Sequence, residues 1–166
     1  MLFKMKKDKI KMKEIVEDAK KLALDYHDNM VDKYDNPYFE HLERVADRVR
    51  EMEYDMVDET SEISLYVAAA YLHDVVEDTD YSMAELTEKF GEIIGGAVEL
   101  LSREKGMTYA TYIDRILVMP SLSGKIARVV KLADLLDHLA GPTPCPAGLI
   151  ARYNKSLYRL ISKGVE

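Results

Sequence analysis

Three observations predict that this sequence folds into an all-α domain. Apolar residues recur at spacings of three and four along nearly the whole chain, as amphipathic helices require. No segment shows the alternation with period two that marks a half-buried strand. The 166 residues, 48% hydrophobic and 32% charged, are enough to enclose one core. We therefore expect a compact single domain over residues 1–166, a helical bundle of seven or eight helices.

The first half of the chain is predicted to contain three helices. Residues 10–28 carry the helical apolar spacing, and Pro37 suits the first position of a second helix over 37–53. Thr60 or Ser61 can cap a third helix, over 63–76. Because this third segment is apolar on almost every face, we expect it to lie in the centre of the domain.

The second half is predicted to add five shorter or more amphipathic helices. Ser82 and Glu85 form a capping-box pattern that opens a short helix ending near Gly91. A helix over 93–101 follows, and Thr108 can cap the next one, over 109–119. The helix expected over 125–139 is broken by the segment GPTPCPAG, and a last helix is expected over 149–162.

The charge and composition exclude several classes of protein. The net charge is −7, so the basic excess typical of a nucleic-acid-binding domain is missing. No apolar run approaches the roughly 18 residues that a membrane span needs, and the N-terminus lacks the pattern of a signal peptide. Cys145 is the single cysteine, which excludes an internal disulfide and favours a reducing compartment. We expect a cytoplasmic protein that binds neither nucleic acid nor membranes.

An unusual polar segment, His73-Asp74-Val-Val-Glu77-Asp78, ends the most apolar predicted helix. On a continuous helix His73 would lie one turn before Glu77, and Asp74 one turn before Asp78. Acids at a helix C-terminus are disfavoured by the macrodipole, and buried anions need partners. A divalent cation held by His73 and Asp74 would be such a partner, and Glu77 and Asp78 would remain free for proton transfer. The alternative is a solvated helix end with ordinary caps.

Two other residues fit the same interpretation. His41 lies on the core-facing side of its predicted helix, and Asp134 lies within an apolar helix face. Alone, a histidine among apolar neighbours is more often a satisfied core residue, and a buried carboxylate can become neutral instead of binding a cation. One bound metal ion would explain all three features together. Lys131 is expected to reach along the core to an acidic neighbour.

The strings PYFEHLERVA, YLHDVVEDTD and VVKLADLLDHL resemble the HD superfamily of metal-dependent phosphohydrolases. Within it they are similar to the hydrolase domain of the RelA/SpoT stringent-response proteins and to the small stand-alone alarmone hydrolases, over residues 19–158. The resemblance implies a compact all-α fold in which four residues hold one manganese ion: His41, His73, Asp74 and Asp134. It also implies that Glu77 and Asp78 position and activate the attacking water. Iron, nickel, cobalt and zinc also suit these ligands.

The resemblance further implies that the reaction removes pyrophosphate from the 3′ position of guanosine tetra- or pentaphosphate. Lys33, Lys105 and Tyr153 match nucleotide-contacting positions, and Arg152 and Lys155 lie close enough to serve as well. The chain departs from the pattern at Asp32, where a basic residue is usual, at Asp35, where glycine is frequent, and at His138, where asparagine is common. We expect His138 to contact the substrate.

These departures leave two alternatives open. The same site could act on another substrate, as a nucleotide phosphomonoesterase or phosphodiesterase. It could also belong to a nucleotide-binding module without turnover, against which the intact Glu77-Asp78 pair argues. The sequence identifies no oligomer interface.

Overall fold

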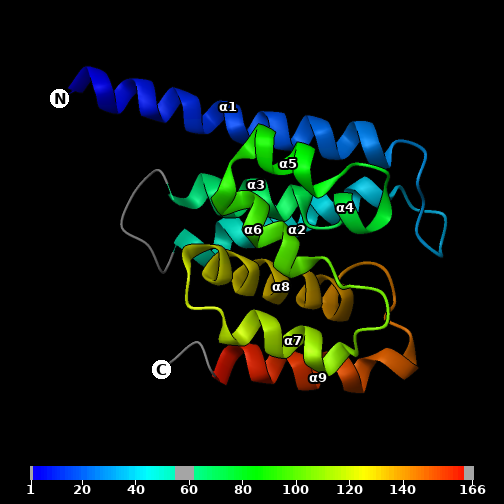
Figure 1. Ribbon diagram of the computed structural model, residues 1–166. Helices are drawn as coiled ribbons and strands as arrows, with labels where there is room; N and C mark the ends of the chain where they lie inside the picture. Colours follow the sequence, from blue (N-terminus) through cyan, green and yellow to red (C-terminus); the bar gives the residue numbers. More distant parts are fainter. Residues whose placement is uncertain (1, 55–61, 163–166) are drawn as a thin grey trace.

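A computed structural model describes residues 2–54 and 62–162, with the side chains of 14–52 and 62–162, and shows nine α-helices and no β-strand within them (Figure 1). The helices are α1 (Leu2–His27), α2 (Tyr38–Tyr54), α3 (Glu62–Leu72), α4 (Val75–Asp78), α5 (Met83–Phe90), α6 (Glu92–Leu101), α7 (Tyr109–Val118), α8 (Leu122–Ala140) and α9 (Ala147–Ser162). The predicted all-α class is confirmed. None of the described helices is both long and apolar enough to cross a membrane.

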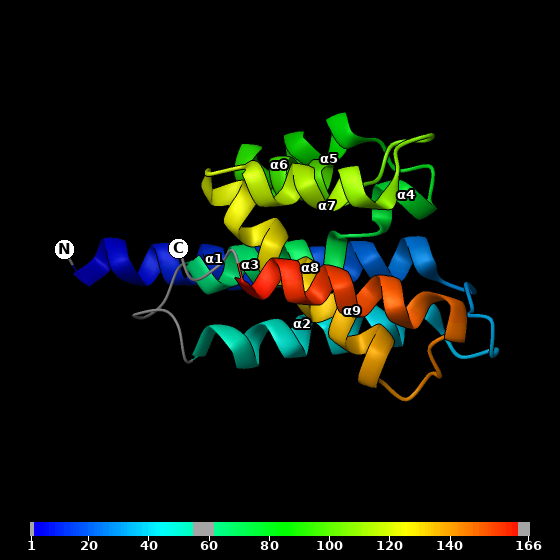
Figure 2. The same ribbon diagram turned by 90° about the horizontal axis from the view of Figure 1, so that it is seen from below.

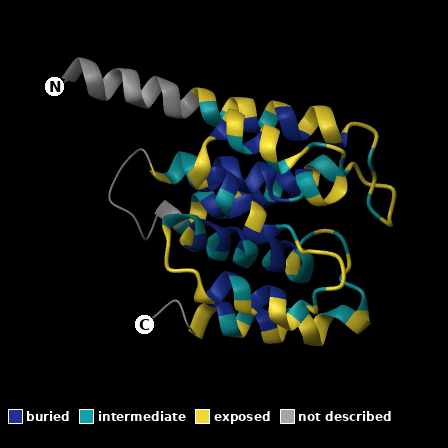
Figure 3. Ribbon diagram, viewed as in Figure 1, coloured by how far each residue is buried: buried dark blue, intermediate teal, exposed yellow. Residues whose placement is uncertain are grey.

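Helices α3 and α8 form the centre of the bundle. Helix α3 packs against α1, α2, α6 and α8, whereas α8 packs against α2, α6, α7 and α9 as well. Viewed from below, α2 lies on one side of this pair and α5, α6 and α7 on the other (Figure 2). Every residue from Tyr66 to Leu72 is buried, as expected for a helix that is apolar all round (Figure 3).

Local signals set several helix ends. Ser82 and Glu85 form the predicted capping box, and the Thr108 side chain accepts a hydrogen bond from the backbone N–H of Thr111. Helix α8 begins three residues earlier than predicted, because Ser121 caps it by accepting from the N–H of Gly124. Helix α1 begins at Leu2 instead of residue 10. The predicted caps Thr60 and Ser61 lie outside the described residues.

One prediction about the polar segment is wrong. Residues 63–76 do not form a continuous helix: α3 ends at Leu72, and the one-turn helix α4 starts at Val75. Glu77 and Asp78 therefore lie in the one-turn helix α4 and not at the C-terminus of the long apolar helix, so the macrodipole argument, which assumed that helix, no longer applies. The backbone N–H of Asp78 still donates to the carbonyl of Asp74 at 2.9 Å, which keeps the two acids one turn apart. This break accounts for the ninth helix.

Candidate metal centre

Three buried side chains from three separate parts of the chain meet at one point. His41 comes from α2, His73 follows α3, and Asp134 comes from the middle of α8. One potential ligand atom of each lies within 4.8 Å of the others. Asp134 Oδ1 is 3.3 Å from His41 Nε2 and 3.8 Å from His73 Nε2. The structure thus brings together three residues that are far apart in the sequence and that were predicted to bind one metal ion.

Both histidines are oriented so that Nε2 faces the centre. His41 Nδ1 lies 2.9 Å from Asp137 Oδ2, and His73 Nδ1 lies 2.8 Å from the carbonyl oxygen of Ala70. Since each Nδ1 donates to an oxygen, each neutral ring carries its lone pair on Nε2. Both Nε2 atoms are buried and make no well-formed hydrogen bond among the described residues. This donor set fits a divalent cation.

Asp134 divides its two oxygens between a lysine and the histidines. Oδ2 accepts from Lys131 Nζ at 2.7 Å, so the acidic neighbour predicted for Lys131 is Asp134 itself. Oδ1 faces His41, His73 and also His138, whose Nε2 is 3.1 Å away. Burial opposes ionisation of Asp134, but Lys131 and the histidines outweigh it and hold its pKa well below the usual range.

Asp74 lies beside this group of three. Its Oδ2 accepts from the Tyr38 hydroxyl at 2.6 Å and is 3.1 Å from His73 Nε2. Tyr38 is a site residue that the sequence interpretation missed, although it stands three positions before His41. Burial lowers the pKa of His41, but the carboxylates of Asp134 and Asp137 outweigh it and raise that pKa to about 10. A cation that binds here must therefore displace a proton.

Two recesses open on either side of the ligand group and share Tyr38, Asp78 and His138. The larger has a volume of about 330 Å³ and lies between the segments 30–38 and 143–146. The smaller, of about 200 Å³, is bordered by Asp74, Asp134 and further residues that are aromatic or cationic, among them Arg103, Tyr109, Lys131, Arg152 and Tyr153. We call them the first and second recess. Anionic and cationic side chains thus meet at the second recess.

Comparisons with known proteins decide the family. A family model described as HD domain matches residues 19–117, more than half of the chain. The chain belongs to the HD domain family. The matched region contains His41, His73 and Asp74, and Asp134 lies beyond it. The resemblance stated from the sequence is therefore confirmed.

Curated relatives of this HD domain protein carry names from alarmone metabolism. A guanosine-3′,5′-bis(diphosphate) 3′-pyrophosphohydrolase of Drosophila melanogaster is 32% identical over 108 residues, 65% of this chain and 57% of that protein. A Mycobacterium leprae protein named "Probable GTP pyrophosphokinase" is 27% identical over 138 residues, 75% of this chain and 15% of that protein. The chain thus spans little more than half of one relative and a small part of the other.

A solved structure supports the HD fold. It belongs to the work "A metazoan ortholog of SpoT hydrolyzes ppGpp and plays a role in starvation responses". It superposes with a TM-score of 0.65 at 24% identity, and the match covers 90% of this chain and 84% of that one. At this identity the likeness establishes the fold alone.

The predicted substrate-binding residues of this HD domain do not all line the same recess. Lys33 lines the first recess, whereas Arg152 and Tyr153 line the second and His138 lines both. Lys105 is exposed and lines neither, so its contact with substrate stays a prediction. Arg103, two residues earlier in the same SREKG segment, lines the second recess and was not predicted.

The two predicted catalytic acids have different surroundings. Glu77 Oε2 accepts from the backbone N–H of Arg103 at 2.9 Å, which ties α4 to the segment after α6. Asp78 lies where both recesses meet. Desolvation within this hollow and the negative charges of Asp74 and Glu77 raise the pKa of Asp78 to about 6.

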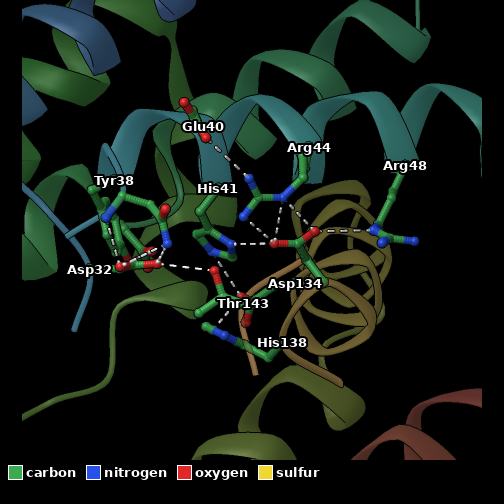
Figure 4. Close-up of polar contacts among 12 residues, drawn as sticks. Asp32, Tyr38, Glu40, His41, Arg44, Arg48, Asp134, His138 and Thr143 are labelled. Carbon is green, nitrogen blue, oxygen red and sulfur yellow. Dashed lines mark hydrogen bonds and ion pairs between the residues drawn. The ribbon is translucent and has the colours of Figure 1, made fainter. Parts of the chain in front are cut away.

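Asp32 serves as a tie between two loops. Its carboxylate accepts from the backbone N–H groups of Tyr34 and Asn36, from the Asn36 amide and from the Thr143 hydroxyl. Figure 4 shows the hydrogen bond from Thr143 to Asp32, which joins the segment after α8 to the loop before α2. These hydrogen bonds outweigh desolvation and lower the pKa of Asp32 to about 2, so the first recess has a fixed negative charge in its wall.

Proposed function

We propose that this HD domain is a metal-dependent phosphohydrolase, with a divalent cation held by His41, His73, Asp74 and Asp134. The meeting of His41, His73 and Asp134 within 4.8 Å carries the proposal. The buried Nε2 atoms of His41 and His73, which make no well-formed hydrogen bond among the described residues, support it, because buried polar atoms without such partners are costly unless a ligand satisfies them. Manganese is the proposed metal.

The chemistry follows from the residues around that group. A divalent cation held by these residues would supply Lewis acidity, which would polarise a phosphate oxygen and acidify the attacking water. Asp78 takes the proton from this water, since its raised pKa suits a general base near neutral pH. Glu77 orients the short helix α4 through the backbone of Arg103. Lys131, Arg103 and Arg152 place positive charge beside the phosphates.

The proposed substrate is guanosine tetra- or pentaphosphate, from which water releases the 3′-pyrophosphate. The cationic wall of the second recess suits a polyphosphate. The relatives named as 3′-pyrophosphohydrolases favour this substrate over other phosphate esters. Asp32 in the wall of the first recess favours a second candidate, a nucleotide phosphomonoesterase or phosphodiesterase whose substrate carries fewer charges on that side.

The proposal extends to the setting of the enzyme. We propose a single HD domain over residues 1–166 that acts in the cytoplasm, where its one cysteine, Cys145, stays reduced. Its partner is a small-molecule nucleotide.

The test is a product assay with manganese-loaded protein and guanosine tetraphosphate, followed by chromatography for guanosine diphosphate and pyrophosphate. Equimolar release of both, lost together with manganese binding in Asp74→Ala and retained in the exposed Asp80→Ala, is the expected result. Release of inorganic phosphate or of a nucleoside monophosphate from other nucleotides, without pyrophosphate from this one, would favour the second candidate. Nucleotide binding without turnover under any divalent metal would show a binding module.

A further inference from the structure

A second buried carboxylate, Asp137, lies directly behind the candidate metal centre. It stands on α8 three residues after Asp134, is 3% exposed, and belongs to none of the ligand or catalytic roles proposed above. Its Oδ2 is 2.9 Å from His41 Nδ1, the ring nitrogen that does not face the cluster. Asp134 and Asp137 therefore hold the two nitrogens of the same imidazole.

The charge of Asp137 is compensated from α2, the helix that carries His41. Arg44 Nε lies 3.0 Å from Oδ1 and 3.2 Å from Oδ2, and its second guanidinium nitrogen lies 3.1 Å from Oδ2. Arg48 Nε lies 3.4 Å from Oδ1. His41, Arg44 and Arg48 are three and four residues apart, so they share one face of α2 (Figure 4). Ionised carboxylates are costly to bury unless both oxygens are satisfied, and here both are.

The two buried histidines are held by different kinds of acceptor. His73 Nδ1 donates to a neutral backbone carbonyl, that of Ala70. His41 Nδ1 donates to the carboxylate of Asp137, which fixes the tautomer and also makes the ring more basic. A carbonyl in the same helix turn moves with its histidine, whereas Asp137 belongs to α8 and links the position of His41 to that of Asp134.

We infer that Asp137 is a positioning residue, which aims His41 Nε2 at the metal and strengthens it as a ligand. The inference rests on the proposed metal site. The competing explanation is an ordinary ion pair between α2 and α8 that contributes only to stability. The two differ in what they predict for metal affinity when Asp137 and Arg48 are changed separately.

The experiment titrates metal-free full-length protein with Co²⁺, followed by visible absorption, and with Mn²⁺, followed by electron paramagnetic resonance. The variants are Asp137→Ala, Asp137→Asn, Arg48→Gln and the surface control Asp47→Asn, each with its thermal unfolding recorded. Asp137→Ala is expected to weaken metal binding by about 10–100-fold and to alter the Co²⁺ spectrum. Asp137→Asn keeps an oxygen that accepts from His41 Nδ1–H, so this variant should lose clearly less metal affinity than Asp137→Ala. Arg48→Gln, which does not touch His41, should unfold at lower temperature and keep the wild-type spectrum.

The outcomes separate this inference from the proposed function. If wild-type protein binds neither metal, the metal-dependent function fails and the inference fails with it. If wild-type binds and folded Asp137→Ala binds equally well with an unchanged spectrum, the function stands and the positioning role is refuted. Equal losses of affinity in Asp137→Ala and Arg48→Gln would also refute it, because they would indicate a general loss of helix packing.

Discussion

Lys131 Nζ donates to Asp134 Oδ2 at 2.7 Å, where Asp134 is buried and the Lys131 side chain is 13% exposed. The pair explains how a carboxylate can stay ionised at the base of the metal centre, since one of its oxygens has a permanent cation. The second oxygen faces three histidine nitrogens. A bound divalent cation would therefore share the charge of Asp134 with Lys131.

This arrangement predicts that Lys131→Met destabilises the metal-free protein much more than the metal-loaded one. Removing one member of a buried ion pair leaves an uncompensated charge, which costs about 3 kcal/mol. A bound cation compensates the negative charge of Asp134 in the variant, so Mn²⁺ should restore much of the lost free energy of unfolding. Denaturant unfolding with chelator and with Mn²⁺ measures both values, and Lys125→Met, an exposed change on the same helix, is the control. If Lys131→Met lowered the free energy of unfolding equally with and without metal, the metal and Lys131 would not share the charge of Asp134.

The rate of hydrolysis should depend on pH through Asp78. A general base works only when ionised, and a carboxyl group with its pKa raised to about 6 is ionised above that value. Activity of metal-loaded protein should therefore fall as pH drops through about 6, and nearby bound metal would move this limb to lower pH. Asp78→Asn should lose most of the activity while keeping the metal. Metal content is measured at each pH, because a flat profile down to pH 5 at full occupancy would exclude Asp78 as the base.

Arg152 is predicted to bind substrate phosphate. It lines the second recess, and its guanidinium lies 4.6 Å from the centroid of the Tyr109 ring and 5.5 Å from that of Tyr153. Arg152→Gln should raise KM for the nucleotide about tenfold with a smaller effect on kcat, since about 1.4 kcal/mol of binding corresponds to a factor of ten. Lys155→Gln, on the same helix and outside both recesses, should behave as wild type. Steady-state kinetics would contradict the assignment if the two variants had the same KM.

Two helical glycines should respond oppositely to alanine. A Cβ at Gly124 would clash with the backbone carbonyl oxygen of Met119, whereas one at Gly148 would have nothing within 4 Å. Gly124→Ala should therefore cost about 1–3 kcal/mol of unfolding free energy through overpacking. Gly148→Ala should raise it by about 0.5–1 kcal/mol, because alanine loses less backbone entropy in a helix. Chemical denaturation measures both, and a neutral Gly124→Ala would show that the turn before α8 can shift.

Much of the fold was predictable because its signals are local. The capping box at Ser82 and Glu85 and the cap at Thr108 act over three residues, and the apolar spacing of each helix acts over one or two turns. The break between α3 and α4 was missed, because helical periodicity continues across His73 and Asp74 and gives no sign of a turn.

The sequence by itself determined the helical class and the residue types that a metal centre needs, His41, the His73-Asp74 pair and Asp134. Only the tertiary structure decided how these residues are used. The partnership of Asp137 with His41, the hydrogen bond from Tyr38 to Asp74 and the entry of Arg103 into the second recess each join separate segments. Such contacts depend on how helices pack against one another, and a spacing rule that acts within one helix contains no information about its neighbours.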